Sequence, residues 1–283
     1  MSENPLVSVI LTTKNESKNI KRFLKSIALQ TYGHMELIVV DNNSSDKTKE
    51  IAWKFTKNVY NYGPERSAQR NFGAKKAGGR YLIFLDADME LSPRVVEDCV
   101  KLALKSRLNI LTIPETTVGA GFVPRVRKFE REMYIDEPDY EVPRFFDRNI
   151  FFEYGGYDEN LTGPEDYDLP YRMRLKNKIG RVTEYIYHHE EGLSLAGLLR
   201  KKYYYAKRGA FYALKHPRLV KIQGTILFRR VYVKHWRKFV SNPFIGAAFL
   251  IVRFLETVWA VAGFVSSVGI TGFLKTFMYL FKK

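Results

Sequence analysis

The sequence has only one cysteine, Cys99, among its 283 residues, so no disulfide can form within a single chain. This excludes an extracellular disulfide-stabilised scaffold and favours a reducing compartment. Residues 1–7 contain no basic segment followed by an apolar one, so we expect no cleavable signal peptide. No Gly-x-Gly-x-x-Gly segment follows the first apolar run and no Gly-Lys-Ser/Thr loop occurs, which counts against dinucleotide dehydrogenases and P-loop enzymes.

Acidic residues are nearly absent from the last third of the chain. Residues 196–283 carry 17 lysines and arginines but one acid, Glu256, whereas the preceding residues carry 29 bases and 29 acids. The whole net charge of +16 therefore lies in this C-terminal segment. The asymmetry predicts two regions, a balanced domain over residues 1–195 and a basic region over residues 196–283.

Short apolar runs rich in branched residues alternate with segments of helical periodicity in the first part of the chain. The runs that fit strands buried on both faces are residues 6–11, 36–40, 81–85 and 108–113. Between the first two runs, apolar residues recur at the spacing of one helical face at Ile20, Phe23, Leu24, Ile27 and Ala28. This alternation predicts an α/β fold with a mostly parallel, doubly wound sheet.

Polar clusters follow three of these predicted strands, at residues 12–16, 41–46 and 86–88. Ligands of such sheets bind beyond the carboxyl ends of the strands, so we expect the clusters to open onto one crevice. Asp86 and Asp88 could both reach a divalent cation, because Mg²⁺ and Mn²⁺ take oxygen ligands and often bridge a carboxylate to a diphosphate. Taken alone, the pair is equally consistent with acids that only end a strand.

Four longer blocks give the chain a more specific pattern. They are VSVILTTKNE, ELIVVDNNSSDKT, RNFGAKKAGGRYLIFLDAD and GGYDENLTGPEDYDL, spread over about residues 6–170. In this order they resemble the blocks of family 2 glycosyltransferases, inverting enzymes that move a sugar from a nucleoside diphosphate donor. The resemblance implies a Rossmann-like GT-A domain that binds a nucleotide sugar together with Mg²⁺ or Mn²⁺.

The first two blocks supply residues for the nucleoside. The resemblance implies that Thr13 and Glu16 hold the nucleoside and that Asp41 accepts a hydrogen bond from its base. The sequence departs from the family pattern at Thr12, where many members have proline, and at residues 42–43, where many have Asp-Gly.

The third block supplies residues for the diphosphate and the metal. The resemblance implies that Arg70 lies near the diphosphate, that Asp86 lies near the ribose, and that Asp88 binds the metal. The chemistry agrees, because a nucleoside diphosphate leaves readily only when its developing charge is neutralised by a cation and a nearby arginine. The alternative for Arg70 is an ordinary arginine on a helix surface.

The fourth block ends in the acidic segment Glu165, Asp166 and Asp168. In the family the aspartate of such a Glu-Asp pair is the general base, which implies Asp166. Inverting transfer needs one carboxylate to take the proton from the attacking acceptor hydroxyl. We expect Glu165 to orient the acceptor and Asp168 to support the start of a helix, although all three acids could serve only that helix.

Two adjacent histidines, His188 and His189, follow a strand-like segment. Neighbouring side chains on a strand point to opposite faces, so we expect one of the two to face the crevice. Some family members use a histidine followed by two acids and a glycine as a further metal ligand. The resemblance therefore implies His189.

Aromatic and basic residues are mixed in two segments of the C-terminal region, residues 198–214 and 226–240. Amphipathic helices of this composition lie in the plane of an anionic membrane, with aromatic side chains at the level of the headgroups. We therefore expect the region to associate with a membrane surface.

Two apolar stretches follow, residues 244–252 and 257–274, separated by Arg253 and Glu256. These two charges are spaced to pair on one helix face, which would lower the cost of burying them. Basic residues flank the stretches on both sides, which fits a single span poorly. We favour one or two helices that lie in or dip into the cytoplasmic leaflet, with a simple span as the alternative.

These features predict a metal-assisted, inverting glycosyltransferase at the cytoplasmic face of a membrane, acting from a UDP- or GDP-sugar on a lipid or lipid-linked acceptor. The alternative from another class is a catalytically silent, nucleotide-binding membrane scaffold. Nucleic-acid binding would explain the charge but not the long apolar runs, which would be exposed to water. A sugar-nucleotide pyrophosphorylase would require a Gly-rich, Arg-containing loop after the first strand, which the sequence lacks.

Overall fold

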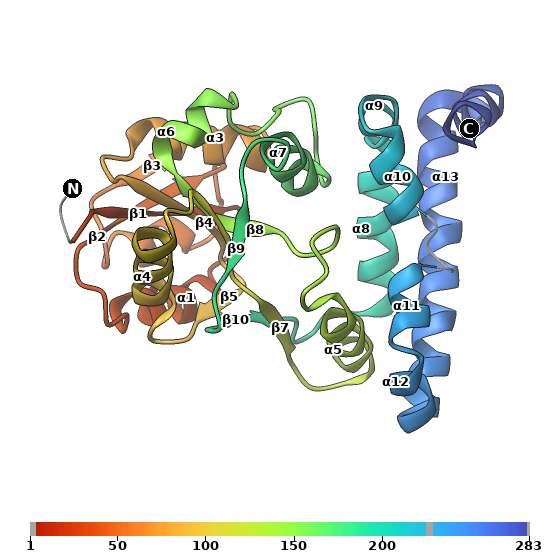
Figure 1. Ribbon diagram of the computed structural model, residues 1–283, viewed down its shortest axis with the longest axis horizontal. Helices are drawn as coiled ribbons and strands as arrows, with labels where there is room; N and C mark the ends of the chain where they lie inside the picture. The colour runs from red at the N-terminus through yellow and green to blue at the C-terminus, as the bar shows by residue number, and fades with distance from the viewer. Residues whose placement is uncertain (1–3, 225–228, 282–283) are drawn as a thin grey trace. The chain divides into compact units, whose positions relative to one another are not determined.

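The computed structural model describes residues 4–224 and 229–281, which form two compact units (Figure 1). The first unit comprises Met1–Thr116, Val142–Glu159 and Asp168–His189, and the second comprises Thr117–Glu141, Asn160–Tyr167 and Glu190–Lys283. The sequence predicts a single boundary near residue 195. In the structure Thr117–Glu141 and Asn160–Tyr167 group with the C-terminal helices instead. The catalytic and membrane roles assigned to the two regions remain predictions.

A seven-stranded sheet forms the centre of the first unit, with the strand order β3-β2-β1-β4-β8-β6-β9. The strands are β1 (Val7–Thr13), β2 (Met35–Asp41), β3 (Val59–Asn61), β4 (Tyr81–Asp86), β6 (Ile110–Thr112), β8 (Pro143–Asp147) and β9 (Ile179–Arg181). β1 pairs in parallel with β2 and β4, whereas β8 runs antiparallel to β4 and β6. The predicted mostly parallel sheet is therefore confirmed. The sequence did not predict β8, which lies in the sheet between β4 and β6, the third and fourth predicted strands.

Helices cover both faces of this sheet (Figure 1). They are α1 (Ile20–Ala28), α2 (Thr48–Ala52), α3 (Arg66–Lys76), α4 (Val95–Ser106) and α6 (Arg148–Glu153), together with α7 (Glu165–Met173), which begins in the second unit. Alternate side chains of β1 enter separate cores: Leu11 packs with the α1 and α4 side, and Ile10 with the α3 and α6 side. Cys99 lies in the first core, and burial raises the pKa of its thiol.

A second, three-stranded sheet has the order β5-β10-β7. Its strands are β5 (Met89–Leu91), β10 (Ile186–His189) and β7 (Glu115–Val118). β5 begins three residues after β4 ends, so residues 87 and 88 form the tight connection between the two sheets. β10 pairs antiparallel with β5 and places His188 opposite Met89.

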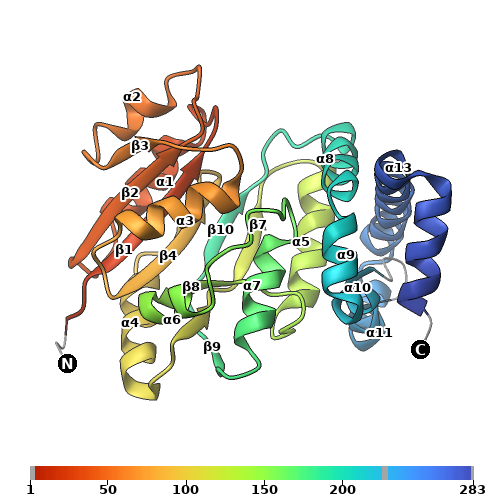
Figure 2. The same ribbon diagram turned by 90° about the horizontal axis from the view of Figure 1, so that it is seen from above.

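The elements that lie wholly in the second unit are helices (Figure 2). They are α5 (Phe122–Tyr134), α8 (Leu195–Lys207), α9 (Ala210–Lys215), α10 (Pro217–Gly224), α11 (Arg230–Lys234), α12 (Trp236–Ser241) and α13 (Pro243–Phe281). Phe249 and Val252 of α13 pack with Phe129 of α5 and Leu198 of α8 in one apolar core. Residues 225–228 of the predicted aromatic and basic segment lie outside the described residues.

The two predicted apolar stretches join into the single helix α13. Its segment Pro243–Tyr279 is long enough to cross a membrane and contains an 18-residue window with a mean hydropathy of 1.8. The helix breaks at Gly269, where φ is 72°, and changes direction there (Figure 2). Glycine suits this position because a side chain disfavours a positive φ. At Gly263 an added Cβ would overlap the carbonyl oxygen of Tyr203, so this glycine allows α13 to approach α8 closely.

Charged residues in the middle of α13 are buried against neighbouring helices. Arg253 contacts Glu256 on the same helix, as predicted, and lies 3.1 Å from Glu130 of α5. Glu256 also lies 3.6 Å from Lys202 of α8. Buried charges are tolerated when they are paired, so this cluster explains how two charges can occupy an apolar helix.

Candidate active site

The carboxyl ends of β1, β2 and β4 meet at one edge of the main sheet. The register places Thr13 of β1 opposite Asp41 of β2, and Thr12 of β1 opposite Asp86 of β4. The three polar clusters predicted from the sequence therefore lie together, as expected for strands that run in parallel.

Asp41 is fully buried at this edge. Its carboxylate accepts hydrogen bonds from the Thr13 hydroxyl at 2.9 Å, and from the backbone N–H and hydroxyl of Ser44 at 2.7 and 2.5 Å. These bonds fix both oxygens of the carboxylate. The structure thus brings together Thr13 and Asp41, two of the residues assigned to the nucleoside.

Glu16 lies on the loop that follows β1. Asn19 donates a hydrogen bond to its carboxylate at 2.9 Å, and the Thr48 hydroxyl accepts one from its backbone N–H at 2.8 Å. Burial raises the pKa of the Glu16 carboxyl, the Asn19 bond opposes that change, and the negative charges of Asp88 and Asp86 add to it. Glu16 therefore lies close enough to Asp88 and Asp86 for their charges to act on it.

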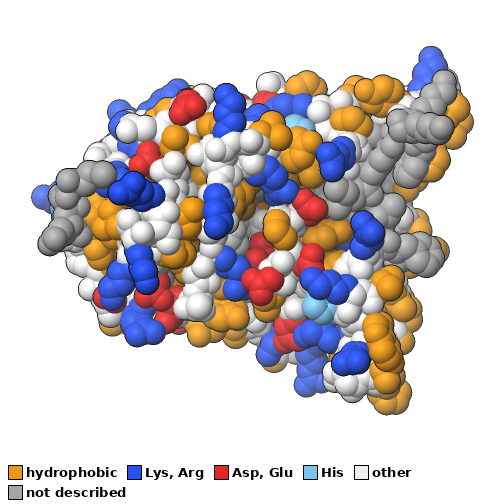
Figure 3. All heavy atoms as spheres, viewed as in Figure 1, with side chains coloured by type: hydrophobic (Ala, Val, Ile, Leu, Met, Phe, Trp, Pro, Cys, Tyr) orange, Lys and Arg blue, Asp and Glu red, His pale blue; other side chains and the backbone are white. Residues whose placement is uncertain are grey.

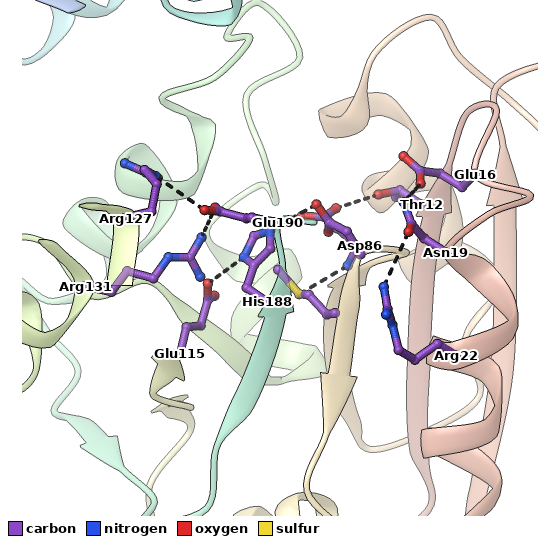
Figure 4. A network of polar contacts seen from close by, with 12 residues as sticks. Thr12, Glu16, Asn19, Arg22, Asp86, Glu115, Arg127, Arg131, His188 and Glu190 are labelled. Carbon is purple, nitrogen blue, oxygen red and sulfur yellow. Dashed lines mark hydrogen bonds and ion pairs between the residues drawn. The ribbon is translucent and has the colours of Figure 1, made fainter. Parts of the chain in front are cut away.

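Asp86 is held by arginines of α3. Arg70 Nη2 lies 3.2 Å from Oδ1 and 3.3 Å from Oδ2 of this carboxylate, and Arg66 lies 3.8 Å from it. The Thr12 hydroxyl donates to the same carboxylate at 3.1 Å (Figure 4). Burial acts to raise the pKa of Asp86, but Arg70 and Arg66 hold it well below its usual range. Arg70 is fully buried, so it is not an ordinary surface arginine.

Asp88 begins a second chain of polar contacts. His188 Nε2 lies 3.0 Å from Asp88 Oδ2. His188 Nδ1 lies 3.3 Å from Glu115 Oε2 (Figure 4). Arg144 in turn donates from Nε to Glu115 Oε1 at 2.5 Å. The imidazole is therefore held between two carboxylates, with its Nε2 directed at Asp88.

The structure places His188 beside Asp88, whereas the sequence interpretation had selected His189. His189 Nε2 lies 2.7 Å from Glu90 Oε2. Adjacent side chains on β10 point to opposite faces, so each histidine reaches a different acid. Alternation alone could not tell which of the two faces the crevice, because that depends on the pairing of β10 with β5.

Glu115 and Arg144 were not predicted from the sequence as site residues. Glu115 begins the short strand β7 and Arg144 lies on β8, which had not been predicted. Neither belongs to the blocks that carry the resemblance. The usable signal was Arg144, a charged residue beside the two phenylalanines of β8, because a charge that is buried requires a partner.

The residues around Asp88 fit a divalent cation in their chemistry. Among the described residues, no group of three or more His, Cys, Asp and Glu side chains is arranged to hold a metal ion. Asp88 and His188 nevertheless offer a carboxylate oxygen and an imidazole nitrogen, 3.0 Å apart. Neighbouring ligands of an octahedral ion with bonds of about 2.1 Å lie about 3 Å apart, so the pair suits two of its positions.

The acidic segment predicted to supply the general base lies at the start of α7. Glu165 is buried and Asp166 is partly exposed, and both belong to the second unit. Asp168 is fully buried inside α7 and pairs with Arg172 one turn later at 2.8 Å, whereas it was expected to support the start of the helix. The catalytic roles of Glu165 and Asp166 remain predictions.

Comparisons with known proteins bear on the family. Residues 8–160 match the family model described as Glycosyl transferase family 2. An uncharacterized glycosyltransferase of Rickettsia typhi is 25% identical over 210 residues, which cover 66% of this chain and 62% of that protein. The UDP-Glc:alpha-D-GlcNAc-diphosphoundecaprenol beta-1,3-glucosyltransferase WfgD of Escherichia coli is 30% identical over 111 residues, or 38% of this chain and 44% of that protein. The chain thus spans less than two thirds of either relative.

Solved structures bear on the fold. The mannosyltransferase PcManGT of Pyrobaculum calidifontis, solved in complex with GDP-Man and Mn²⁺, is similar with a TM-score of 0.59 at 17% identity. The similarity covers 98% of this chain and 80% of that one. The family match covers more than half of the 283 residues. Taken with the mostly parallel sheet and its polar edge, these similarities mean that the chain belongs to glycosyltransferase family 2 and has the GT-A fold.

Proposed function

We propose that this glycosyltransferase moves a sugar, with inversion, from a UDP- or GDP-sugar to a lipid or lipid-linked acceptor at a membrane. The observation that carries the donor half is the pairing of Asp86 with Arg70 and Arg66, directly beside Asp88 and His188. Positive side chains next to a carboxylate and imidazole suit a diphosphate and its cation. The similar protein WfgD is named for UDP-Glc, and the similar mannosyltransferase PcManGT was solved in complex with GDP-Man, which supports this donor class.

The crevice would divide the donor among its residues. Thr13, Glu16 and Asp41 would contact the nucleoside, and Asp86 would face the ribose. Arg70 is committed to Asp86 and would act near the diphosphate mainly through its charge. Arg66 retains 32% exposure of its side chain, so it is the arginine better able to reach a phosphate oxygen from the solvent side.

Asp88 and His188 would hold the divalent cation. A bound Mg²⁺ or Mn²⁺ would supply positive charge that stabilises the departing diphosphate. Glu115 would fix the ring of His188 through Nδ1, and Arg144 would fix Glu115. Carboxylates that hold a metal-binding histidine in this way typically contribute to metal affinity.

His188 contacts Glu115, and the neighbouring His189 contacts Glu90. Replacing each of these two carboxylates gives a matched test of the arrangement. Glu115→Gln is expected to weaken Mn²⁺ binding in the presence of UDP about tenfold or more, because the second carboxylate no longer orients His188. Glu90→Gln changes the partner of His189 in the same way and is expected to leave Mn²⁺ affinity unchanged. Titration calorimetry or the paramagnetic resonance of free Mn²⁺ measures both. Equal affinities for Glu115→Gln and the wild type would remove His188 from the metal site.

The membrane half of the proposal is supported by the outer face of α13. Ile251, Phe254, Val258 and Val261 follow one another at helical spacing and are 61, 55, 43 and 40% exposed. Hydrophobic side chains along this helix are visible in Figure 3. The opposite side of the helix holds the buried ion cluster, so α13 has a protein-facing side and an apolar outer side. This favours a helix lying in the surface of an anionic, cytoplasmic leaflet.

One assay tests both halves. The acceptor, a polyprenyl phosphate, is presented in vesicles of phosphatidylcholine and phosphatidylglycerol, and a panel of UDP- and GDP-sugars is supplied with Mn²⁺ or Mg²⁺. We expect one donor to be consumed, a product of inverted anomeric configuration, and co-sedimentation of the protein with the vesicles. Retention of configuration would contradict the mechanism, and protein left in the supernatant would contradict the membrane role. Nucleotide binding without turnover of any donor would instead favour the silent scaffold.

A further inference from the structure

An apolar groove lies in the second unit, where the first turns of α5 and α8 meet the first four turns of α13. Its volume is about 620 Å³. Phe122 of α5 and Leu195 of α8 form one side, and α13 contributes a stripe that includes Phe244, Ala247, Ile251 and Leu255. None of the side chains that line the groove carries a polar atom.

This composition determines what the groove can hold. A sugar, a nucleotide or an extended peptide would lose hydrogen bonds to water without replacing them, at a cost of roughly 1–3 kcal/mol for each buried polar group. A hydrocarbon chain has no such groups and gains from burial. The volume lies within the range of about 300–1,000 Å³ that is usual for pockets that bind small ligands.

The charge of the region indicates what the hydrocarbon would be attached to. Glu256 is the only acid after residue 195, and it is buried against Arg253 and Lys202. The outward charges of residues 196–283 are therefore all positive. Arg125, one helical turn beyond Phe122 on α5, adds an exposed cation near the mouth of the groove. An amphiphile with an apolar chain and an anionic head complements this surface.

The groove is also continuous with the outer face of α13. Ile251 belongs both to the groove and to the exposed stripe, and Phe244 and Phe122 at its rim are 89 and 53% exposed. A chain could therefore pass from a bilayer in contact with α13 into the groove without crossing water.

We propose that this groove binds the hydrocarbon chain of the anionic, lipid-linked acceptor, an inference that rests on the proposed function for the identity of that lipid. The chain lies along the first turns of α13, with Phe122 and Leu195 on its other side. Binding there ties the acceptor to the enzyme through its tail, whatever sugar or phosphate it carries.

Photolabelling tests the groove without any transfer of sugar. The probe is farnesyl phosphate with a benzophenone at the end of its chain, added to the full-length protein in phosphatidylcholine vesicles, and adducts are mapped by mass spectrometry. We expect adducts on the first turns of α5 and α13. Ala247→Trp fills the groove and is expected to lower the labelling about tenfold, the factor for lost burial of roughly two methylene groups.

Ala262→Trp is the matched control, because Ala262 is an exposed alanine on the same helix outside the groove. It is expected to label like the wild type. Ile251→Ser, a milder change of an exposed lining residue, is expected to reduce labelling as well. Equal labelling of Ala247→Trp and the wild type, or adducts confined to other helices, would overturn the proposal.

Competition identifies the occupant. Unlabelled polyprenyl phosphate is expected to suppress the adducts, whereas phosphatidylglycerol at the same concentration is not. Equal suppression by both lipids would overturn the assignment to the acceptor and make the groove a site for bulk phospholipid. Because labelling requires neither donor nor turnover, failure of sugar transfer with labelling intact would count against the proposed function alone.

Discussion

Replacing Asp166 by asparagine is expected to lower kcat for sugar transfer about 10³-fold, within the range that a positioned general base contributes. Asparagine matches aspartate in size but cannot take the proton from the acceptor hydroxyl. The KM for the donor and the melting temperature should change little, because Asp166 is partly exposed. Steady-state kinetics with the acceptor in vesicles measures the effect.

Asp168→Asn provides the comparison, since it makes the same chemical change two residues away. Asp168 is fully buried and pairs with Arg172, which also donates to the carbonyl oxygen of Gly156 at 2.7 Å. We expect this variant to lose stability by a few kcal/mol while the folded fraction keeps its kcat. If Asp166→Asn retained the wild-type rate, or if both variants lost activity equally, Asp166 would not be the base.

Replacing Arg253 by methionine is expected to destabilise the second unit by about 3–5 kcal/mol. The change preserves the length of the side chain but removes the guanidinium that pairs with the carboxylates of both Glu130 and Glu256, which are 4 and 1% exposed. Arg200→Met is the control, because it removes an exposed cation from the neighbouring helix α8. Denaturant unfolding of both variants measures the difference.

A second substitution tests the cause of that loss. The double variant Arg253→Met/Glu256→Gln should lose less stability than the sum of the two single variants, because it leaves fewer unpaired charges. Strict additivity would mean that the cluster does not stabilise α13 as a unit.

Lowering the pH should reduce the difference in unfolding free energy between the wild type and Arg253→Met. Burial acts to raise the pKa of Glu130, but Arg253 and Arg127 hold it well below its ordinary value. A depressed pKa contributes stability that is present above the unfolded value of about 4.3 and lost as the pH falls below it. The difference in unfolding free energy should therefore be full at pH 7 and smaller at pH 4. A gap that widened on acidification would contradict this account.

Local pattern was sufficient to predict much of the fold. The strands over residues 6–11 and 81–85 were recognisable because central parallel strands are buried on both faces and therefore continuously apolar. β8 was missed because it is short and contains Arg144, whose partner Glu115 is 29 residues away in sequence. Its charge makes sense only once the two strands have been brought together.

The site residues also fall into those that the sequence could predict and those that it could not. Asp41, Asp86 and Asp88 could be predicted because they follow strands that are recognisable from the sequence. The choice between His188 and His189 depends on the pairing of β10 with β5, and the contact from His188 to Asp88 joins residues 100 positions apart. Such contacts follow from tertiary packing rather than from any local pattern.

The inward position of Glu256 has a practical consequence for handling the protein. Glu256, the one acidic side chain of residues 196–283, is enclosed. Every ionic contact that this surface makes with resin, glass or lipid therefore joins a positive side chain to a negative group. At about 0.01 M salt its field extends about 30 Å, and at 1 M about 3 Å. Ionic strength will therefore govern adsorption and recovery during purification, and binding constants will be comparable only when measured in one buffer.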